Sequence, residues 1–206
     1  MKSFLLIVLC LLFSVPLHAD VSGSIEYIGN VKILNLWGTW SEMGYAHGYI
    51  LGPNIKEVFE KYFLEIVGSV SNYNMARTYF QYYFEVPPEF EAYSQGIING
   101  ASDTISIYSD TLERFLDYID ICVVSAIPDL SALGGMKQFL CSSVSAWDDA
   151  TIDDPELSGA PAISRNLDYY VDTGSSILEN NLLITFDPET GQDWISIGFP
   201  GFAGCL

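Results

Sequence analysis

The hydrophobic pattern of this chain of 206 residues changes its period once, at Gly134 and Gly135. Before this point, apolar side chains recur at the helical spacing of three and four residues, for example over residues 55–67. After it, the apolar runs are short, of β type, and separated by turn residues. One strand is expected ahead of the helices, over residues 31–37. This order of a strand, a helical block and then several strands predicts an α+β fold.

A capping box predicts where the first helix begins. Thr39 and Glu42 form the pattern T-x-x-E, in which each side chain binds the other residue's backbone N–H. Within this helix, Gly44 and Gly48 lie four residues apart, and each costs ~1 kcal/mol of helix propensity relative to alanine. We therefore expect the two glycines to let another backbone approach closely. The period predicts further helices over residues 55–67, 75–84, from 89 onward, and 111–124.

Four strands are expected in the last third of the chain, joined as an antiparallel meander. Turn residues separate them, notably an acidic turn over residues 148–157 and a hairpin turn over residues 187–191. The meander would leave two exposed edges, which folded proteins avoid. We therefore expect the sheet to be truncated at its C-terminus. The expected strands cover residues 139–147, 161–170, 182–186 and 194–199.

The charge balance narrows the classes of function. Eight Lys and Arg residues stand against 26 Asp and Glu residues, which gives a net charge of -18. Such a chain repels phosphate backbones and anionic membrane surfaces, so we expect no nucleic-acid partner. With 50% hydrophobic and 14% aromatic residues, it is not a disordered chain. Two His and no Cys-x-x-Cys pair or Gly-rich phosphate loop argue against a metal or cofactor.

Residues 1–19 have the pattern of a secretory signal peptide. Lys2 supplies the positive start, an apolar stretch follows, and Ala19 supplies the small residue at the cut. The apolar stretch is too short for a membrane span, which needs ~20 residues, although an uncleaved N-terminal anchor remains the alternative. We expect an exported protein with no membrane span after signal removal. It would keep three cysteines and a single histidine, His47.

One basic residue stands out in the last part of the chain. Residues 141–206 contain eleven acidic side chains and a single base, Arg165. Arg165 and Asp168 lie on the strand expected to pair with the strand that carries Cys141. Residues 165 and 168 fall on opposite faces of a regular strand, so both serve one site only if one lies at a strand end or bulge.

Two segments resemble the N-terminal-nucleophile hydrolases, and most closely the isopenicillin-N acyltransferase-like family of self-cleaving acyltransferases and amidases. The first begins Cys141-Ser142-Ser143-Val144, and the second reads Arg165-Asn166-Leu167-Asp168. The choloylglycine hydrolase and penicillin V acylase family is related. Upstream, the glycine motifs at residues 36–48 and 95–101 are also similar to the family, although residues 95–101 are usually more acidic and alanine-rich there.

The resemblance implies a four-layer αββα sandwich and a catalytic cysteine. Residues 20–140 would form a small helical chain that stays bound after the chain cuts itself between Leu140 and Cys141. Residues 141–206 would start the catalytic chain within the same domain. The freed α-amino group, of pKa ~7.7–8.0, would be the base for the Cys141 thiol, with Asp168 holding the amine and Arg165 beside the sulfur. The implied partner is a small amide or acyl-donor substrate, and oxyanion-hole residues are expected beyond Leu206.

Other interpretations of these residues stay open. Cys141 could be a buried structural thiol, Arg165 a surface ion-pair partner, and Asp168 a turn or capping residue. The chain could then be a non-catalytic secreted binding protein, or a Cys–His hydrolase that uses His47. We interpret His47 itself as a packing or hydrogen-bonding residue.

Three further features have a structural interpretation. We expect Cys122 to pack in the core, although a disulfide with Cys205 stays open. The tyrosine-rich residues 73–84 are expected to be core rather than the lining of an acyl pocket. The acidic pairs of residues 148–154 lack the spacing of a calcium loop and are expected at a solvated hairpin tip.

Overall fold

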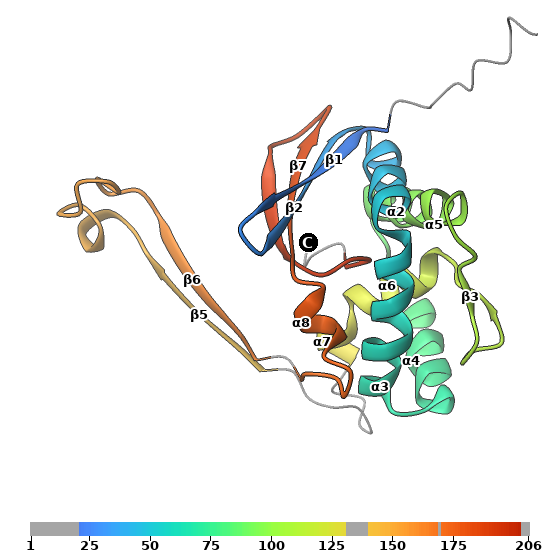
Figure 1. Cartoon of the computed structure of the whole chain (residues 1–206). Helices are drawn as coiled ribbons and strands as arrows, with labels where there is room; N and C mark the ends of the chain where they lie inside the picture. The colour runs from blue at the N-terminus through green and yellow to red at the C-terminus, as the bar shows by residue number, and fades with distance from the viewer. Residues whose placement is uncertain (1–20, 131–139, 169, 203–206) are drawn as a thin grey trace, which may run out of the picture.

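A computed structural model of the chain describes residues 21–130, 140–168 and 170–202 (Figure 1). The expected signal peptide and Cys205 lie outside these residues. Four strands form the main sheet, in the order β1-β2-β7-β8. Strand β2 runs antiparallel to β1 and parallel to β7, and β8 is antiparallel to β7. The strands are β1 (Gly23–Ile28), β2 (Val31–Gly38), β7 (Leu182–Pro188) and β8 (Trp194–Gly198).

The predicted meander of the last four strands is wrong. Only β7 and β8 remain neighbours in the sheet, and the early strand β2 pairs with β7, with Leu34 opposite Ile184. The apolar pattern of a strand shows which face is buried but does not select its partner. Leu34, Leu36, Ile184 and Phe186 are buried on one face of the sheet and belong to one hydrophobic cluster with residues of α2 and α5.

A long helical rod follows β2. It consists of α2 (Trp40–Glu57), a π-helical stretch η1 (Val58–Phe63) and α3 (Leu64–Val67). The predicted capping box is confirmed: the Glu42 N–H donates to Thr39 Oγ1 at 3.3 Å, and the Thr39 N–H donates to Glu42 Oε2 at 2.8 Å. Pro53 is accommodated by a kink at Leu51, where φ is -118°. The predicted apolar stripe of residues 55–67 is buried in the core.

One predicted helix, over residues 111–124, is wrong in its first half. A small hairpin, β3 (Tyr108–Ser109) and β4 (Arg114–Phe115), occupies this region, and helix α6 begins only at Tyr118. Asp117 caps α6 in a second capping box with Asp120, which fixes the start of the helix. The other predicted helices are confirmed. The remaining helices are α4 (Val70–Tyr83), α5 (Pro88–Ser102), α7 (Ile127–Leu130) and α8 (Ser176–Glu179).

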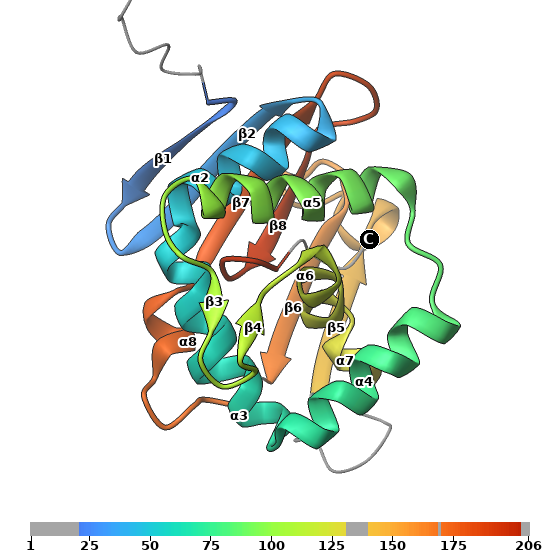
Figure 2. The same cartoon turned by 90° about the vertical axis from the view of Figure 1, so that its right-hand side faces the viewer.

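Helices α2 and α5 lie side by side in very close contact (Figure 2). A Cβ atom added at Gly48 would lie 2.0 Å from the Ile97 carbonyl oxygen, and one at Gly44 would lie 2.1 Å from that of Tyr93. The contact is reciprocal, because a Cβ at Gly100 would lie 2.0 Å from the Tyr45 carbonyl oxygen. The expectation that these glycines admit another backbone is confirmed.

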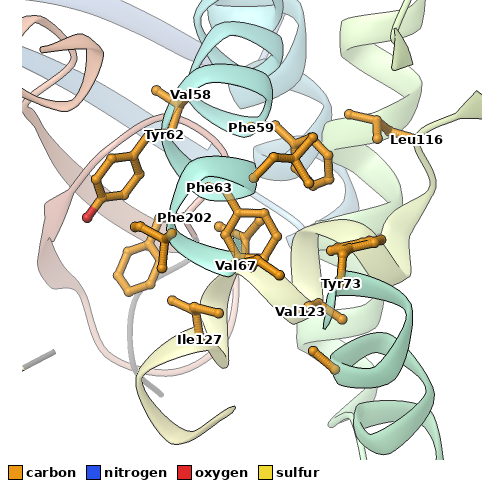
Figure 3. Packing of buried hydrophobic residues seen from close by; sticks show 14 of the residues in the cluster. Val58, Phe59, Tyr62, Phe63, Val67, Tyr73, Leu116, Val123, Ile127 and Phe202 are labelled. Atoms are coloured by element: carbon orange, nitrogen blue, oxygen red, sulfur yellow. The ribbon is translucent and has the colours of Figure 1, made fainter. Parts of the chain in front are cut away.

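The larger core cluster is built around the rod (Figure 3). Phe59 and Phe63 point toward Tyr73 of α4, and both pairs of rings meet edge to face at 5.9 Å. Val123 of α6 and Phe202, from the segment after β8, complete the packing. Helices far apart in the sequence therefore share one apolar interior. Within the described residues, no helix is long and apolar enough to cross a membrane.

Strands β5 (Leu140–Ala146) and β6 (Ala162–Asp168) form a separate antiparallel hairpin that extends away from the body (Figure 1). Two predicted strands thus pair with each other as expected, but outside the main sheet. Val144 and Ile163 on this hairpin are 70% and 73% exposed. A two-stranded hairpin alone is marginally stable in water, so these apolar side chains are available for a covering layer.

Candidate functional site

The β5–β6 hairpin brings together the backbone of the three residues singled out in the sequence. In its register, Leu140 lies opposite Asp168, Cys141 opposite Leu167, and Ser143 opposite Arg165. The expected cleavage bond, between Leu140 and Cys141, is therefore directly across the ladder from the end of β6. The side chains of Leu140, Cys141 and Arg165 lie outside the described part of the structure.

The register also shows how the positions of Arg165 and Asp168, which fall on opposite faces of a regular strand, lie relative to Cys141. Positions opposite each other on paired antiparallel strands share a face, and successive positions alternate. Positions 141 and 165 therefore belong to one face, and positions 140 and 168 to the other. Asp168 is the last described residue of β6, because residue 169 lies outside the described part of the structure. Position 165 is thus on the same face as position 141, and Asp168 lies opposite the residue that precedes the expected cut.

Asp168 has a described side chain. Its carboxylate is exposed and accepts a hydrogen bond from the Asn166 side-chain amide, with Nδ2 and Oδ1 2.8 Å apart. The two residues are on the same face of β6, two positions apart. This contact holds the carboxylate at the end of the strand, next to the Leu140 position of β5.

His47 is fully buried in α2, and both of its ring nitrogens are occupied. The Gly201 N–H donates to Nε2 at 3.2 Å, so Nδ1 carries the ring hydrogen and donates to the Tyr93 hydroxyl at 2.6 Å. Burial lowers the pKa of His47 to about 3, so the ring is neutral at physiological pH. The interpretation of His47 as a packing and hydrogen-bonding residue is confirmed.

Cys122 is the other cysteine with a described side chain. It is fully buried in α6, and its thiol donates to the Ser94 hydroxyl, with the two atoms 3.6 Å apart. Burial raises the pKa of this thiol to about 11, so it stays protonated at neutral pH. The prediction that Cys122 packs in the core is confirmed, and Cys122 is a free thiol.

A buried charge cluster was missed by the sequence analysis. Asp120 of α6 is fully buried and accepts hydrogen bonds from Arg77 of α4, from Arg114 of β4 and from the Tyr73 hydroxyl. Arg77 also binds Asp117 in a two-pronged contact, at 3.0 and 2.7 Å. Burial by itself would raise the pKa of Asp120, but the hydrogen bonds led by Arg114 and Tyr73 lower it overall. The only local signal was the Asp117 and Asp120 capping spacing.

The cluster has the chemistry of a structural tie rather than a catalytic centre. Both guanidinium groups are committed to carboxylates, and the Tyr73 pKa is raised well above its ordinary value, first by burial and then by the Asp120 charge. The pKa of Asp120 is lowered and those of Arg77, Arg114 and Tyr73 are raised, which moves these four groups away from neutral pH. The cluster joins α4, β4 and α6. Among the described residues, no group of His, Cys, Asp and Glu is arranged to hold a metal ion.

The structure also describes the tyrosine-rich residues 73–84 and the acidic turn of the hairpin. Tyr73 and Phe80 are buried, which confirms the core interpretation for them, but Tyr82 and Tyr83 are 79% and 65% exposed, so that interpretation is wrong for these two. The acidic residues of the hairpin tip are exposed, and the Asp154 carboxylate accepts backbone N–H bonds from residues 156 and 157. Asp154 thus acts as a turn residue.

Comparisons with known proteins leave the family open. No model of a known protein family matches the chain. A protein of Archaeoglobus fulgidus, described as an uncharacterized protein, is 27% identical over 203 residues, which is 90% of this chain and 32% of the relative. The chain thus spans about a third of the length of this relative. The similarity carries no activity from one protein to the other.

Proposed function

We propose that the chain is an exported, self-cleaving cysteine amidase or acyltransferase, with Cys141 as the nucleophile. The observation that carries the proposal is the β5–β6 register, in which Asp168, the last described residue of β6, lies opposite Leu140. A cut before Cys141 would create the new amine one residue along the strand from the position opposite Asp168, which supports a role for this carboxylate. The resemblance of Cys141 and Arg165-Asn166-Leu167-Asp168 to the N-terminal-nucleophile families supports the same assignment.

The choice of base follows from the histidines. A thiol nucleophile needs a proton acceptor, and His47 is buried, neutral and bonded at both ring nitrogens. His18 belongs to the expected signal peptide. An α-amino group has an ordinary pKa of ~7.7–8.0 and accepts a proton close to neutral pH. The amine of Cys141 is therefore our candidate base. The burial of His47 also favours this mechanism over a Cys–His dyad.

The proposed self-cleavage has two steps. The Cys141 sulfur attacks the Leu140 carbonyl carbon, the peptide C–N bond breaks, and the Cys141 nitrogen takes the thiol proton and becomes an amine. Water then hydrolyses the resulting thioester, which leaves a carboxylate on Leu140 and restores the thiol. The mature reaction repeats this chemistry on a substrate amide: the acyl group forms a thioester on Cys141, the amine leaves with the proton held by the α-amino group, and water or another amine takes the acyl group.

Asp168 and Arg165 have different proposed roles. Asp168 accepts hydrogen bonds from the α-amino group and orients it toward the sulfur, because a carboxylate favours the protonated amine that forms during attack. Arg165, on the face of position 141, lowers the pKa of the thiol from its ordinary ~8.5 and so raises the thiolate fraction.

The proposed fold is the four-layer αββα sandwich. Helices α2 and α5 and the main sheet supply two layers. The sheet face away from α2 carries Trp37, Ile195 and Ile197, which are 43%, 63% and 69% exposed. A second sheet that includes β5 and β6 would bury this face together with Val144 and Ile163. The exposed apolar side chains on both surfaces support this arrangement.

Intact-mass measurement of the purified, expressed chain tests self-cleavage. The expected result is two fragments, one ending at Leu140 and one beginning at Cys141, and a single uncut chain for Cys141→Ala. Cys122→Ala is the matched control, because it removes a thiol that is buried and protonated. A wild-type chain that stays whole, or a Cys141→Ala chain that is still cut, would overturn the proposal and favour a non-catalytic binding protein.

A further inference from the structure

A second site lies in the helical body, in a cavity of about 240 Å³. The cavity is between the end of α4, the segment that leads into α5, and the end of α6. Phe80, Phe84 and Phe90 form aromatic walls, and the buried Cys122 lines its inner part. None of the described residues that line it belongs to β5 or β6.

The size and the walls indicate what the interior accepts. An enclosed apolar cavity of ~150 Å³ holds a benzene molecule, so this larger cavity, which is open to solvent on one side, has room for an aromatic ring with a short side chain. Phenyl walls favour such a ring, because aromatic pairs gain energy from edge-to-face and offset contacts beyond simple burial. The interior therefore suits an aryl group better than a sugar or a phosphate.

The polar lining indicates the charge of the occupant. Glu85 and Asp129 both line the cavity, and both are exposed. Within the described residues, neither carboxylate has an ion-pair partner. With a net charge of -18, the chain disfavours an anionic ligand. A cation near Glu85 and Asp129 would be attracted by both carboxylates.

Among the described residues that line the cavity, none carries a positive charge. Cys122 carries a protonated thiol, since burial raises its pKa, and the negative charges of Glu91, Asp117 and Asp120 contribute in the same direction. The cavity thus combines a neutral, apolar interior with carboxylates along its lining.

We propose that this cavity binds a protonated arylalkylamine, with the ring between the phenylalanines and the ammonium group at Glu85 and Asp129. The assignment goes beyond the proposed function, because it does not depend on Cys141 or on self-cleavage. The occupant is a small organic cation with one aryl group, not an acyl chain or a carboxylate.

Isothermal titration calorimetry of the full purified chain tests the proposal with three probes. 2-Phenylethylammonium has both required groups, 3-phenylpropionate has the ring with the opposite charge, and ethylammonium has the charge without the ring. We expect 2-phenylethylammonium to bind at least ~10-fold more tightly than either of the other two. Equal affinity for the cation and the anion, or no binding of 2-phenylethylammonium up to ~10 mM, would overturn the proposal.

Two variants separate the charge from the cavity. Glu85→Gln combined with Asp129→Asn alters only exposed side chains, so it should fold normally and bring the affinities for the cation and the anion within ~2-fold. Ala126→Leu, at the end of α6, should fill the cavity and weaken binding of both aromatic probes. A double variant that keeps the full preference for the cation would count against the proposal, even if Ala126→Leu fails to fold.

Discussion

The α2–α5 interface and the β5–β6 hairpin differ strongly in how closely their residues are packed. At the interface, glycines let two backbones touch, and a Cβ at Gly48 would lie 2.0 Å from the Ile97 carbonyl oxygen. On the hairpin, Val144 and Ile163 are 70% and 73% exposed. The α2–α5 interface is therefore held by contacts that leave no spare volume, whereas the hairpin is held mainly by its own ladder.

The residues that stabilise the fold and the residues proposed for catalysis therefore lie in different regions of the molecule. The buried Asp120 cluster and the glycine contacts stabilise the body, and the residues proposed for catalysis lie on the β5–β6 hairpin, whose apolar side chains Val144 and Ile163 are exposed. A catalytic thiol gains from a water-excluding environment, in which electrostatic interactions are stronger. The hairpin would acquire that environment only when a further layer covers it. Four predictions test how far the two regions differ.

The largest effect is expected at the buried charge cluster. Asp120→Asn should lower the free energy of unfolding by about 3–5 kcal/mol, because Arg77 and Arg114 would lose their buried carboxylate partner. Glu57→Gln is the control, since Glu57 pairs with an exposed lysine at i+4 and should cost less than about 0.5 kcal/mol. Urea unfolding measures both. Similar midpoints for the two variants would show that the cluster does not hold the body together.

The glycine contact comes next. Gly48→Ala should destabilise the chain by about 2–3 kcal/mol, since the new methyl group meets backbone atoms and the helices must separate. Gly52→Ala in the same helix should cost much less, because its Cβ meets the Thr104 hydroxyl at 2.9 Å and a side chain can move. The same unfolding measurement compares them. Equal losses would contradict the role assigned to backbone contact.

His47 gives the body a pH dependence. Its pKa is about 3 in the folded chain against an ordinary ~6.5, so between these values the unfolded chain binds more protons. Stability from this group is complete above pH ~6.5 and falls as the pH drops, by about 1.4 kcal/mol per unit and about 2 kcal/mol by pH 5. His47→Gln should remove this slope while keeping a hydrogen-bonding side chain. Parallel stability curves for the two proteins would show that His47 does not titrate on unfolding.

The smallest effect is expected on the hairpin. Ile163→Ala should change the free energy of unfolding by less than about 0.5 kcal/mol, because the side chain is 73% exposed. Ile184→Ala, in the fully buried part of β7, is the matched control and should cost about 2–5 kcal/mol. A loss above about 1 kcal/mol at Ile163 would show that another layer covers the hairpin in solution, which would strengthen the sandwich proposal.

Local patterns determined much of this structure before any coordinates. Three features were predicted from residues within a few positions of each other: the capping box of Thr39 and Glu42, the close approach at Gly44 and Gly48, and the burial of Cys122. The candidate catalytic residues Cys141, Arg165 and Asp168 came from local motifs in the same way. The pairing of β5 with β6 followed from two apolar runs separated by an acidic turn.

Tertiary structure alone decided which distant elements meet. Strand β2 pairs in parallel with β7, and Arg77 and Arg114 meet at Asp120, so residues far apart in the chain come together. The same packing decides which tyrosines of α4 are buried and which are exposed. A strand or a charged side chain has many partners that satisfy its local pattern equally well. The choice among them is made by the packing of the whole core, because only that packing fixes which surfaces lose water together.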